Sequence, residues 1–444
     1  MTTTSDTQQP TAALSLQQQF LRMFAQGFEA GPFGPHYTEA FAWRVSGSVD
    51  EDVLRLALAD VVERHEALRT VVHLEDGGGQ SIVPAVPPEL EVVGLDASPG
   101  ADRDRRAEEL MIETETRPFP ADHVPLLRAV LGRFDEEDSV LVLCAHHSAA
   151  DVWSIQVVLK DLAQCYTARA AGKEPALPEA TQYRDYVTAQ QEEADSPAVA
   201  ASRAYWRDTL QGARILVAPV RTTDQSPATS YHRFTTEARV SEEVSRLAKA
   251  TRSSPFMVLL AAFAVFTNRR TEATDITVPT FTPGREHRFQ STVGSFFNFT
   301  PLRVRLEGCR TFRDVVARTR TACVGAFSHE LPLLHLLAEA PELMSSAGPE
   351  AVPTLFQAVQ PPYLMEGDRY GDLEFTAIWR RVIPQPLGSD TPDGMIWSMH
   401  LGSTELVGGL SFSRHLFERA DVVEQAEEFL ALIGELVADP DAAI

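Results

Sequence analysis

Apolar and polar positions switch between two periods along this chain, which indicates alternating helices and strands. Apolar residues recur at helical spacing after Ser15 and again over residues 51–68, with Asp50 as a suitable N-cap for the second helix. Strand-like alternation follows at 70–73, and the glycine run at 77–79 predicts a turn after it. The first part of the chain is therefore expected to fold as helices interleaved with short strands.

A nearly continuous apolar run at 139–145 is typical of a strand that is buried on both faces. The run leads directly into His146 and His147, and a helix is expected from about Trp153 to about Gly172. The two histidines therefore stand where a buried strand turns into a helix.

The second half of the chain repeats this alternation. Ser254 followed by Pro255 is a typical helix start, strands are expected at 275–280, 298–304 and 395–401, and the last helix at 421–437. We therefore predict an α/β protein with two lobes. The proposed boundaries are a disordered tail at 1–12, an N-terminal lobe at 13–215 and a C-terminal lobe at 216–444, with the proline-containing stretch 214–230 as the linker.

The length of the chain supports this division into two lobes, and its charge narrows the possible partners. A chain of 444 residues is long enough for two domains of ordinary size. The formal net charge of −23 argues against nucleic acid as a partner, because phosphate binding needs a basic surface. The four cysteines form no Cys-x-x-Cys pair, there is no signal-peptide pattern, and no apolar run reaches the roughly 18 residues of a membrane span. A cytoplasmic protein without a membrane partner is expected.

The histidine pair is the most chemically suggestive feature. Neighbouring side chains on a strand point to opposite faces, so His146 and His147 cannot share one role. A neutral histidine can take a proton from an amine or a hydroxyl group, and the following helix N-terminus could stabilise an oxyanion. Asp151 could orient the imidazole ring or hold the turn together. A purely structural pair stays open at this point, and no metal is expected because a third ligand is not evident.

Two other chemistries lack their usual sequence signals. The glycine run at 77–79 is not followed by the Gly-Lys-Ser/Thr of a phosphate-binding loop, and no Gly-x-Ser-x-Gly elbow of a serine hydrolase occurs.

Separated segments of the chain resemble the motifs of condensation domains of nonribosomal peptide synthetases, in the chloramphenicol-acetyltransferase-like superfamily. The matching segments are Ser15–Gln19, Arg64–Thr70, His146–Ser154, Tyr183–Tyr186 and Val293–Asn298. The resemblance implies two acetyltransferase-like lobes in a V around a central substrate tunnel. It implies acyl transfer in natural-product biosynthesis, from a donor carried on the phosphopantetheine arm of a carrier protein, with no cofactor bound by the chain itself.

The resemblance also assigns roles to individual residues. His147 matches the active-site histidine, whereas His146 and Asp151 match positions of the same motif regarded as mainly structural. Arg285 matches an arginine that pairs with the motif aspartate across the lobes. The other positions expected to line the tunnel or support the site are Val152, Trp153, Ser154, Gly294, Phe296 and Asn298.

One departure and one absence refine this expectation. Val152 stands where the motif has glycine, which predicts a narrower tunnel or an unusual acceptor. No carrier or adenylation motif is found, so we expect a free-standing enzyme that meets its carrier in trans and acylates a small amine or alcohol.

Three alternatives compete with this expectation. A coenzyme-A-dependent acyltransferase stays open, although the Asp-Phe-Gly-Trp-Gly motif of its plant branch is missing. An epimerisation domain is disfavoured because Trp153 precedes Ser154, and a non-catalytic recruitment module is disfavoured because His147 is retained.

Overall fold

The computed structural model describes residues 12–75, 77–98, 100–222, 228–358, 365–390, 393–401 and 405–444. Residues 1–11 of the predicted disordered tail lie outside this range, whereas Ala12 is ordered and pairs with Gln80. The chain divides into two units. Unit 1 comprises the described parts of Met1–Ala194, Arg285–Phe297 and Pro361–Ile378, and unit 2 those of Asp195–Gly284, Asn298–Gln360 and Trp379–Ile444.

Unit 1 is built on a six-stranded sheet in the order β12-β13-β1-β6-β5-β4. The strands are β1 (Thr38–Ser46), β4 (Leu90–Gly94), β5 (Leu127–Arg133), β6 (Asp138–His146), β12 (Glu366–Tyr370) and β13 (Leu373–Ala377). The helices of this unit are α1 (Leu16–Arg22), α2 (Glu51–Arg64), α3 (Arg103–Glu115), α4 (Val152–Ala170) and α5 (Tyr183–Glu193). A separate hairpin joins β2 (Thr70–His73) to β3 (Gly79–Ile82), as the glycine run predicted.

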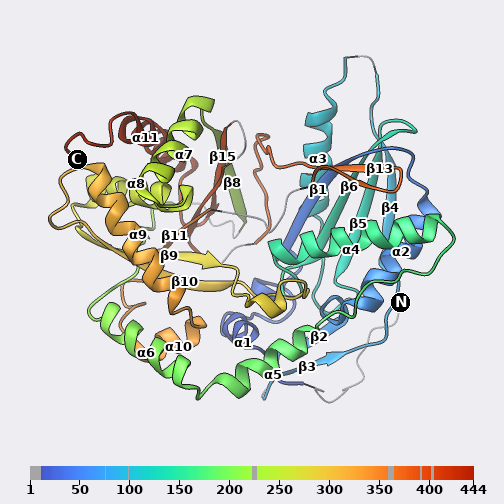
Figure 1. Ribbon diagram of the computed structural model, residues 1–444, viewed down its shortest axis with the longest axis horizontal. Helices are drawn as coiled ribbons and strands as arrows, with labels where there is room; N and C mark the ends of the chain where they lie inside the picture. Colours follow the sequence, from blue (N-terminus) through green and yellow to red (C-terminus); the bar gives the residue numbers. More distant parts are fainter. Residues whose placement is uncertain are drawn as a thin grey trace. The chain divides into compact units, whose positions relative to one another are not determined.

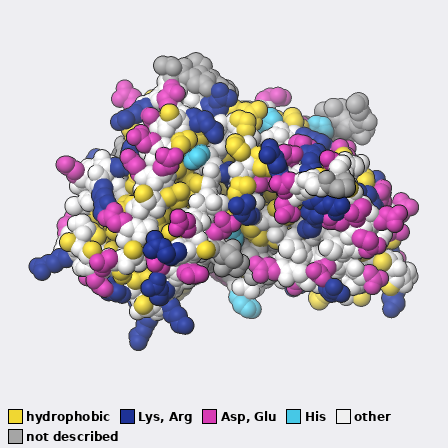
Figure 2. Space-filling view, turned by 90° about the horizontal axis from the view of Figure 1, so that it is seen from above, with side chains coloured by type: hydrophobic (Ala, Val, Ile, Leu, Met, Phe, Trp, Pro, Cys, Tyr) yellow, Lys and Arg dark blue, Asp and Glu magenta, His cyan; other side chains and the backbone are white. Residues whose placement is uncertain are grey.

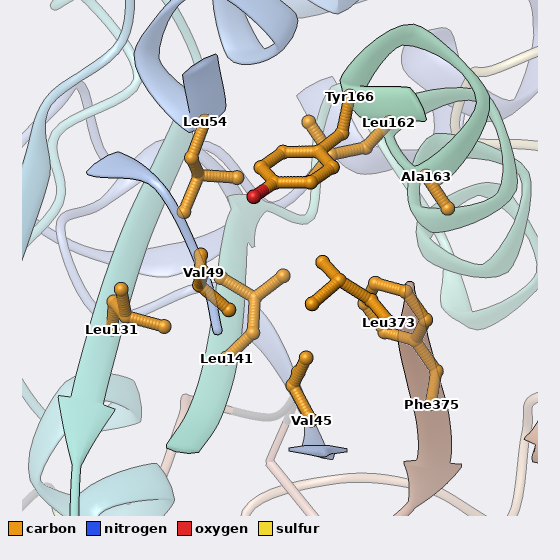
Figure 3. A pocket seen from close by; sticks show the side chains of 10 residues that line it. All are labelled: Val45, Val49, Leu54, Leu131, Leu141, Leu162, Ala163, Tyr166, Leu373 and Phe375. Atoms are coloured by element: carbon orange, nitrogen blue, oxygen red, sulfur yellow. The ribbon is translucent and has the colours of Figure 1, made fainter. Parts of the chain in front are cut away.

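Both faces of strand β6 are covered, which confirms the interpretation of its apolar run. Val140 and Val142 belong to an apolar cluster with residues of α3, whereas Leu141 and Leu143 belong to the larger cluster that includes α2 and α4. Helices α2 and α4 lie side by side across the sheet (Figure 1). Beneath α4, apolar side chains from the sheet and from α2 and α4 surround a small cavity with room for about one water molecule (Figure 3).

Unit 2 contains a five-stranded sheet in the order β7-β11-β14-β15-β8 and a separate β9–β10 pair. Its strands are β7 (Val217–Pro219), β8 (Thr229–Thr235), β9 (Asp275–Thr282), β10 (Asn298–Arg305), β11 (Ala351–Ala358), β14 (Met395–Leu401) and β15 (Leu406–Ser413). Its helices are α6 (Pro197–Thr209), α7 (Ala238–Thr251), α8 (Pro255–Thr271), α9 (Phe312–Ser328), α10 (Leu333–Glu339) and α11 (Arg419–Ala438).

Aromatic side chains fill the core of unit 2, where Phe263 of α8 contacts Phe356, Trp397 and Phe429. Among the described residues no single helix is long and apolar enough to cross a membrane. Helices α7 and α8 pass such a test only as a pair, and they are bent by 103° at their junction.

The predicted domain boundary is wrong in two respects. The units change after Ala194 rather than at 215, and the predicted linker contains β7, which pairs with β11. The described part of Pro361–Ile378, from Met365 onward, joins unit 1 because β13 pairs with β1, from Trp43 opposite Ala377 to Ser46 opposite Glu374. Residues 223–227 of the predicted linker lie outside the described residues.

The helix predicted over 51–68 is also too long. Helix α2 ends at Arg64, because His65 adopts an extended backbone conformation and its ring bonds to Asp161 of α4 at 2.9 Å. Asp161 also accepts a hydrogen bond from Arg64 at 2.7 Å. Burial lowers the pKa of His65. The pKa of Asp161 stays low despite burial, because Asp161 accepts bonds from His65 and Arg64. A tertiary contact therefore stops the helix where local propensity would continue it.

Candidate functional site

The pairing of β6 with β1 separates the two histidines. His146 lies opposite Thr38, and the backbone N–H of His147 donates to the carbonyl of Tyr37 at 2.8 Å. Because side chains alternate along a strand, His146 points into the interior and is fully buried. The His147 side chain points the other way and is 17% exposed. The expectation that the two histidines face opposite sides is confirmed.

His146 is fixed as a neutral ring. Its Nδ1 accepts a hydrogen bond from the backbone N–H of Ser148 at 3.2 Å, so its Nε2 carries the proton and donates to the carbonyl of Gly34 at 3.0 Å. Burial lowers the pKa of His146 to about 4. This ring ties the turn after β6 to the segment before β1 and is too deeply buried to meet a ligand.

The imidazole of His147 is held in the opposite tautomer. Its Nδ1 lies 2.9 Å from the carbonyl oxygen of Ala150, and since a carbonyl only accepts, Nδ1 must donate. Nε2 is then the nitrogen with the available lone pair. The ring stacks on Tyr37 with centroids 4.8 Å apart and contacts Phe297 at 5.1 Å. A partly exposed imidazole that accepts through Nε2 in its neutral form can act as a general base.

Asp151 holds the turn that follows the histidines. It is the N-cap of α4, where its Oδ1 accepts from the backbone N–H of Ser154 at 2.8 Å. Its Oδ2 accepts from the backbone N–H of Phe296 at 3.1 Å. The hydrogen bonds of this carboxylate serve the turn and not the ring of His147, which is instead oriented by the carbonyl of Ala150. Two roles were left open for Asp151, orienting the imidazole ring or holding the turn together, and the structure shows that it holds the turn.

The expected ion pair between Asp151 and Arg285 is present at 2.6 Å, with side chains 7% and 1% exposed. The guanidinium group of Arg285 also donates to the carbonyl of Thr292 and to the hydroxyl of Ser154, and lies 3.9 Å from the ring centroid of Phe296. The expectation that this pair crosses the lobes is wrong, because Arg285–Phe297 belongs to unit 1 together with Asp151.

The loop after Arg285 is bonded tightly to the start of α4. The hydroxyl of Ser154 donates to the carbonyl of Gly294 at 2.7 Å and accepts from its N–H at 3.0 Å. A Cβ atom at Gly294 would lie 2.1 Å from the ring of Tyr183, so only glycine fits there. Phe296 packs edge-on against the same ring. Gly294 and Phe296 therefore support the site from within unit 1.

The other expected site residues fall into three places. The indole N–H of Trp153 donates to the carbonyl of Gln290 at 2.8 Å, which again joins α4 to this loop. Val152 is the first residue of α4 and is half-buried. Asn298 belongs to unit 2, where its amide donates to the carbonyl of Leu331 at 2.8 Å. Asn298 is thus not part of the network around Asp151.

The segments that carried the family resemblance also contact one another. The hydroxyl of Tyr183 donates to the carbonyl of Ser295 and accepts from Ser15, each at 2.8 Å. The amide of Gln17 donates to the hydroxyl of Tyr186 at 2.7 Å. Burial raises the pKa of Tyr183. Buried hydrogen bonds in unit 1 thus join three of these segments, Ser15–Gln19, Tyr183–Tyr186 and the part of Val293–Asn298 that contains Ser295.

Sequence reasoning missed two aromatic neighbours of His147, Tyr37 and Phe297. Tyr37 precedes β1, and nothing in the sequence says that β1 is the partner of β6 at this register. Phe297 could have been found, since it stands where the similar family motif has valine.

Nothing in the described part of the chain brings together three or more His, Cys, Asp or Glu side chains in a way that could hold a metal ion. On the face shown in Figure 2, acidic and basic side chains are interspersed. The net negative charge is therefore not concentrated there.

The site is a partly exposed histidine whose neutral form accepts through Nε2, on a turn locked by a buried Asp–Arg pair in an α/β unit. A site of this class can deprotonate a hydroxyl or amine. The condensation-domain family model matches residues 8–352, and the chain belongs to the condensation-domain family. A linear gramicidin synthase of Brevibacillus parabrevis is 30% identical over 443 residues, which cover 97% of this chain but only 8% of that protein.

Two solved structures are similar over nearly the whole chain. The SgcC5 protein from Streptomyces globisporus, in complex with (R)-(-)-1-(2-naphthyl)-1,2-ethanediol and sucrose, is 44% identical with a TM-score of 0.93. The match covers 97% of this chain and 100% of that one. The first condensation domain of the calcium-dependent antibiotic synthetase is 20% identical with a TM-score of 0.77, covers 97% of each chain and shows the fold.

Proposed function

We propose that this chain transfers an acyl group from a carrier-bound thioester to an alcohol, and so forms an ester. The single observation that carries the proposal is the state of His147, whose Nδ1 is occupied by the Ala150 carbonyl and whose Nε2 can accept a proton. Condensation domains act on substrates held by carrier proteins. The choice of an alcohol over an amine is the finer part of the proposal and rests on the likeness to SgcC5.

The proposed step begins when Nε2 of His147 takes the proton of the acceptor hydroxyl. The oxygen attacks the thioester carbonyl carbon, and the tetrahedral intermediate collapses as the carbon–sulfur bond breaks. The leaving thiolate then takes the proton from Nε2, so that ester and thiol are formed and the histidine is neutral again. The bond from Nδ1 to Ala150 persists in both protonation states and keeps Nε2 toward the acceptor.

An aryl-substituted 1,2-diol is the acceptor class that we propose. SgcC5 was crystallised with a naphthyl ethanediol, and 44% identity makes a related acceptor reasonable for this chain. The half-buried ring of Phe297 next to His147 offers apolar, aromatic surface to an aryl group beside the reacting hydroxyl. The similar family motif has valine at the position of Phe297, and a valine side chain would offer less of that surface.

We further propose that the donor is an aminoacyl or aryl group on the phosphopantetheine arm of a separate carrier protein. The chain itself would bind no other cofactor. Natural-product biosynthesis is the setting, in keeping with the family and with relatives such as the phosphinothricin tripeptide synthetase PhsC.

The test is an intact-mass transfer assay. The protein is mixed with an aminoacyl-loaded carrier protein and, in parallel, with an aryl 1,2-diol, the matching amino alcohol, or both. His147→Ala is the test variant. His73→Ala is the matched control, because His73 lies on β2 and its ring bonds to Ser81 of β3, which is not among the site residues.

Ester formation that depends on His147 supports the proposal. Amide formation alone refutes the alcohol assignment. Transfer from an acyl-coenzyme A but not from any loaded carrier refutes the carrier assignment. Carrier binding without transfer from either donor would favour the recruitment-module alternative instead.

A further inference from the structure

A carboxylate faces the reactive nitrogen of His147 from the neighbouring strand. Glu39 on β1 lies opposite Ala145 of β6, one pair away from the end of the ladder. Residues two apart on a strand share a face, so Ala145, His147 and Glu39 lie on the same side of the sheet. The strand register therefore makes Glu39 the diagonal neighbour of His147.

Oε1 of Glu39 lies 3.6 Å from Nε2 of His147, with side chains 28% and 17% exposed. This distance is too long for a hydrogen bond but is within the range of an ion pair once the imidazole is charged. The nitrogen that faces Glu39 is the same one that must take the proton of the acceptor, because Nδ1 is already bonded to Ala150.

The other groups around this imidazole do not provide such a charge. Tyr37 stacks on the ring, and burial together with the charge of Glu39 raises the pKa of its phenol, so that it stays neutral. His146 is buried on the other face as a neutral ring. Asp151 is already paired with Arg285. Within the described residues, Glu39 is the carboxylate that lies within ion-pair distance of Nε2 of His147.

We propose that Glu39 is a positioning residue that stabilises the imidazolium form of His147 during transfer. This inference rests on the proposed function. As the acceptor proton moves to Nε2 and the oxygen–carbon bond forms, a positive charge develops on the ring, 3.6 Å from the carboxylate. Glu39 keeps its own proton state throughout. The charge disappears when the proton passes to the leaving thiolate, so the step balances without another reactant.

Glu39→Gln keeps the size of the side chain but removes its charge. Without the carboxylate the ring is a weaker base, so the plateau of kcat/KM should fall by up to about 10-fold. The charged, inactive form of the ring also becomes less favourable. The acidic limb of the pH profile should therefore move to lower pH by up to about one unit. Glu39→Asp restores the charge at a longer distance and should recover part of the rate and of the limb position.

The experiment measures kcat/KM between about pH 5 and 9 for the wild type, Glu39→Gln and Glu39→Asp. Glu91→Gln is the matched control, since Glu91 is a partly exposed carboxylate on β4 of the same sheet, paired with Arg117. Far-UV circular dichroism checks the fold of each variant. The control should show the wild-type profile.

A lower plateau together with an acidic limb at lower pH supports the proposal. An unchanged profile overturns it, and so does a lower plateau with an unmoved limb, because a merely structural defect gives that result. An NMR titration of the His147 ring in wild type and Glu39→Gln provides a second reading without substrate. If the wild type transfers nothing but the titration still shifts, the proposed function fails while the electrostatic coupling stands.

Discussion

Removing the carboxylate of Asp151 should destabilise unit 1 strongly. In Asp151→Ala the buried guanidinium of Arg285 loses its partner, α4 loses its N-cap, and the N–H of Phe296 loses its acceptor. Breaking a buried ion pair from one side typically costs about 3–5 kcal/mol, and an N-cap about 1 kcal/mol. Arg285 keeps the carbonyl of Thr292 and the ring of Phe296, so the lower end applies to the pair. The sum is about 4 kcal/mol in the free energy of unfolding.

The assay is thermal and urea denaturation followed by circular dichroism, with a double-mutant cycle. For a unit of this size 1 kcal/mol corresponds to about 2–4 °C, so Asp151→Ala should lower the Tm of the affected transition by about 8–16 °C. Arg285→Met removes the other half of the pair. The double variant no longer buries an unpaired charge and should be more stable than Asp151→Ala by about 2 kcal/mol.

The cycle also separates the pair from the other losses. The cap and the Phe296 bond disappear in both Asp151 variants, so only the interaction with Arg285 appears in the coupling energy. A Tm of Asp151→Ala within about 2 °C of the wild type would refute the reasoning, because the stated change is several times larger. Strict additivity of the two substitutions would refute the ion pair as its cause.

Three further predictions concern the histidines and the aromatic neighbour. His147→Ala should lower transfer by about two to four orders of magnitude without changing the Tm, as measured by product mass and thermal denaturation; near-normal turnover would remove its role as base. Phe297→Val should raise KM for an aryl diol by about 2- to 10-fold, from the loss of about 0.5–1.5 kcal/mol of ring contact, and leave a small aliphatic diol unaffected in steady-state assays. Because the ring of His146 is buried in its neutral form, the free energy of unfolding should decrease as the pH is lowered. The folded pKa of His146, about 4, lies below its unfolded value, so its contribution is complete above the unfolded pKa of about 6.5 and is lost as the pH falls toward 4. Urea denaturation of wild type and His146→Gln over this range measures it, and equal pH slopes would contradict it.

The local pattern of the sequence predicted the part of the site that depends on one strand and one turn. The apolar run at 139–145 placed a doubly buried strand before the histidines, and strand alternation separated His146 from His147. The family resemblance added the pairing of Asp151 with Arg285. These features follow from residues that are adjacent in sequence or from motifs matched residue by residue.

What could not be predicted depends on which strands become neighbours. The pairing of β6 with β1 brings Tyr37 and Glu39 to His147, and the pairing of β1 with β13 draws residues 365–378 into unit 1. Register is fixed by the burial of whole strand faces, and no short pattern in either strand specifies its partner. The early end of α2 has the same origin, since Asp161 lies 96 residues beyond His65.

These contacts also change the meaning of the motif aspartate. Asp151 does not touch the imidazole of His147; it fixes the turn in which the Ala150 carbonyl sits, and that carbonyl sets the tautomer of the ring. The loop at 285–297 is the other anchor of the turn, through Arg285 and the N–H of Phe296. A loop distant in sequence thus helps to fix the turn whose Ala150 carbonyl selects the nitrogen of His147 that carries the proton. Val152 follows Asp151 but contributes no side-chain hydrogen bond to this network, because an aliphatic side chain has none to give. Its substitution for glycine should therefore act on the space beside the site and leave the proton chemistry of His147 intact.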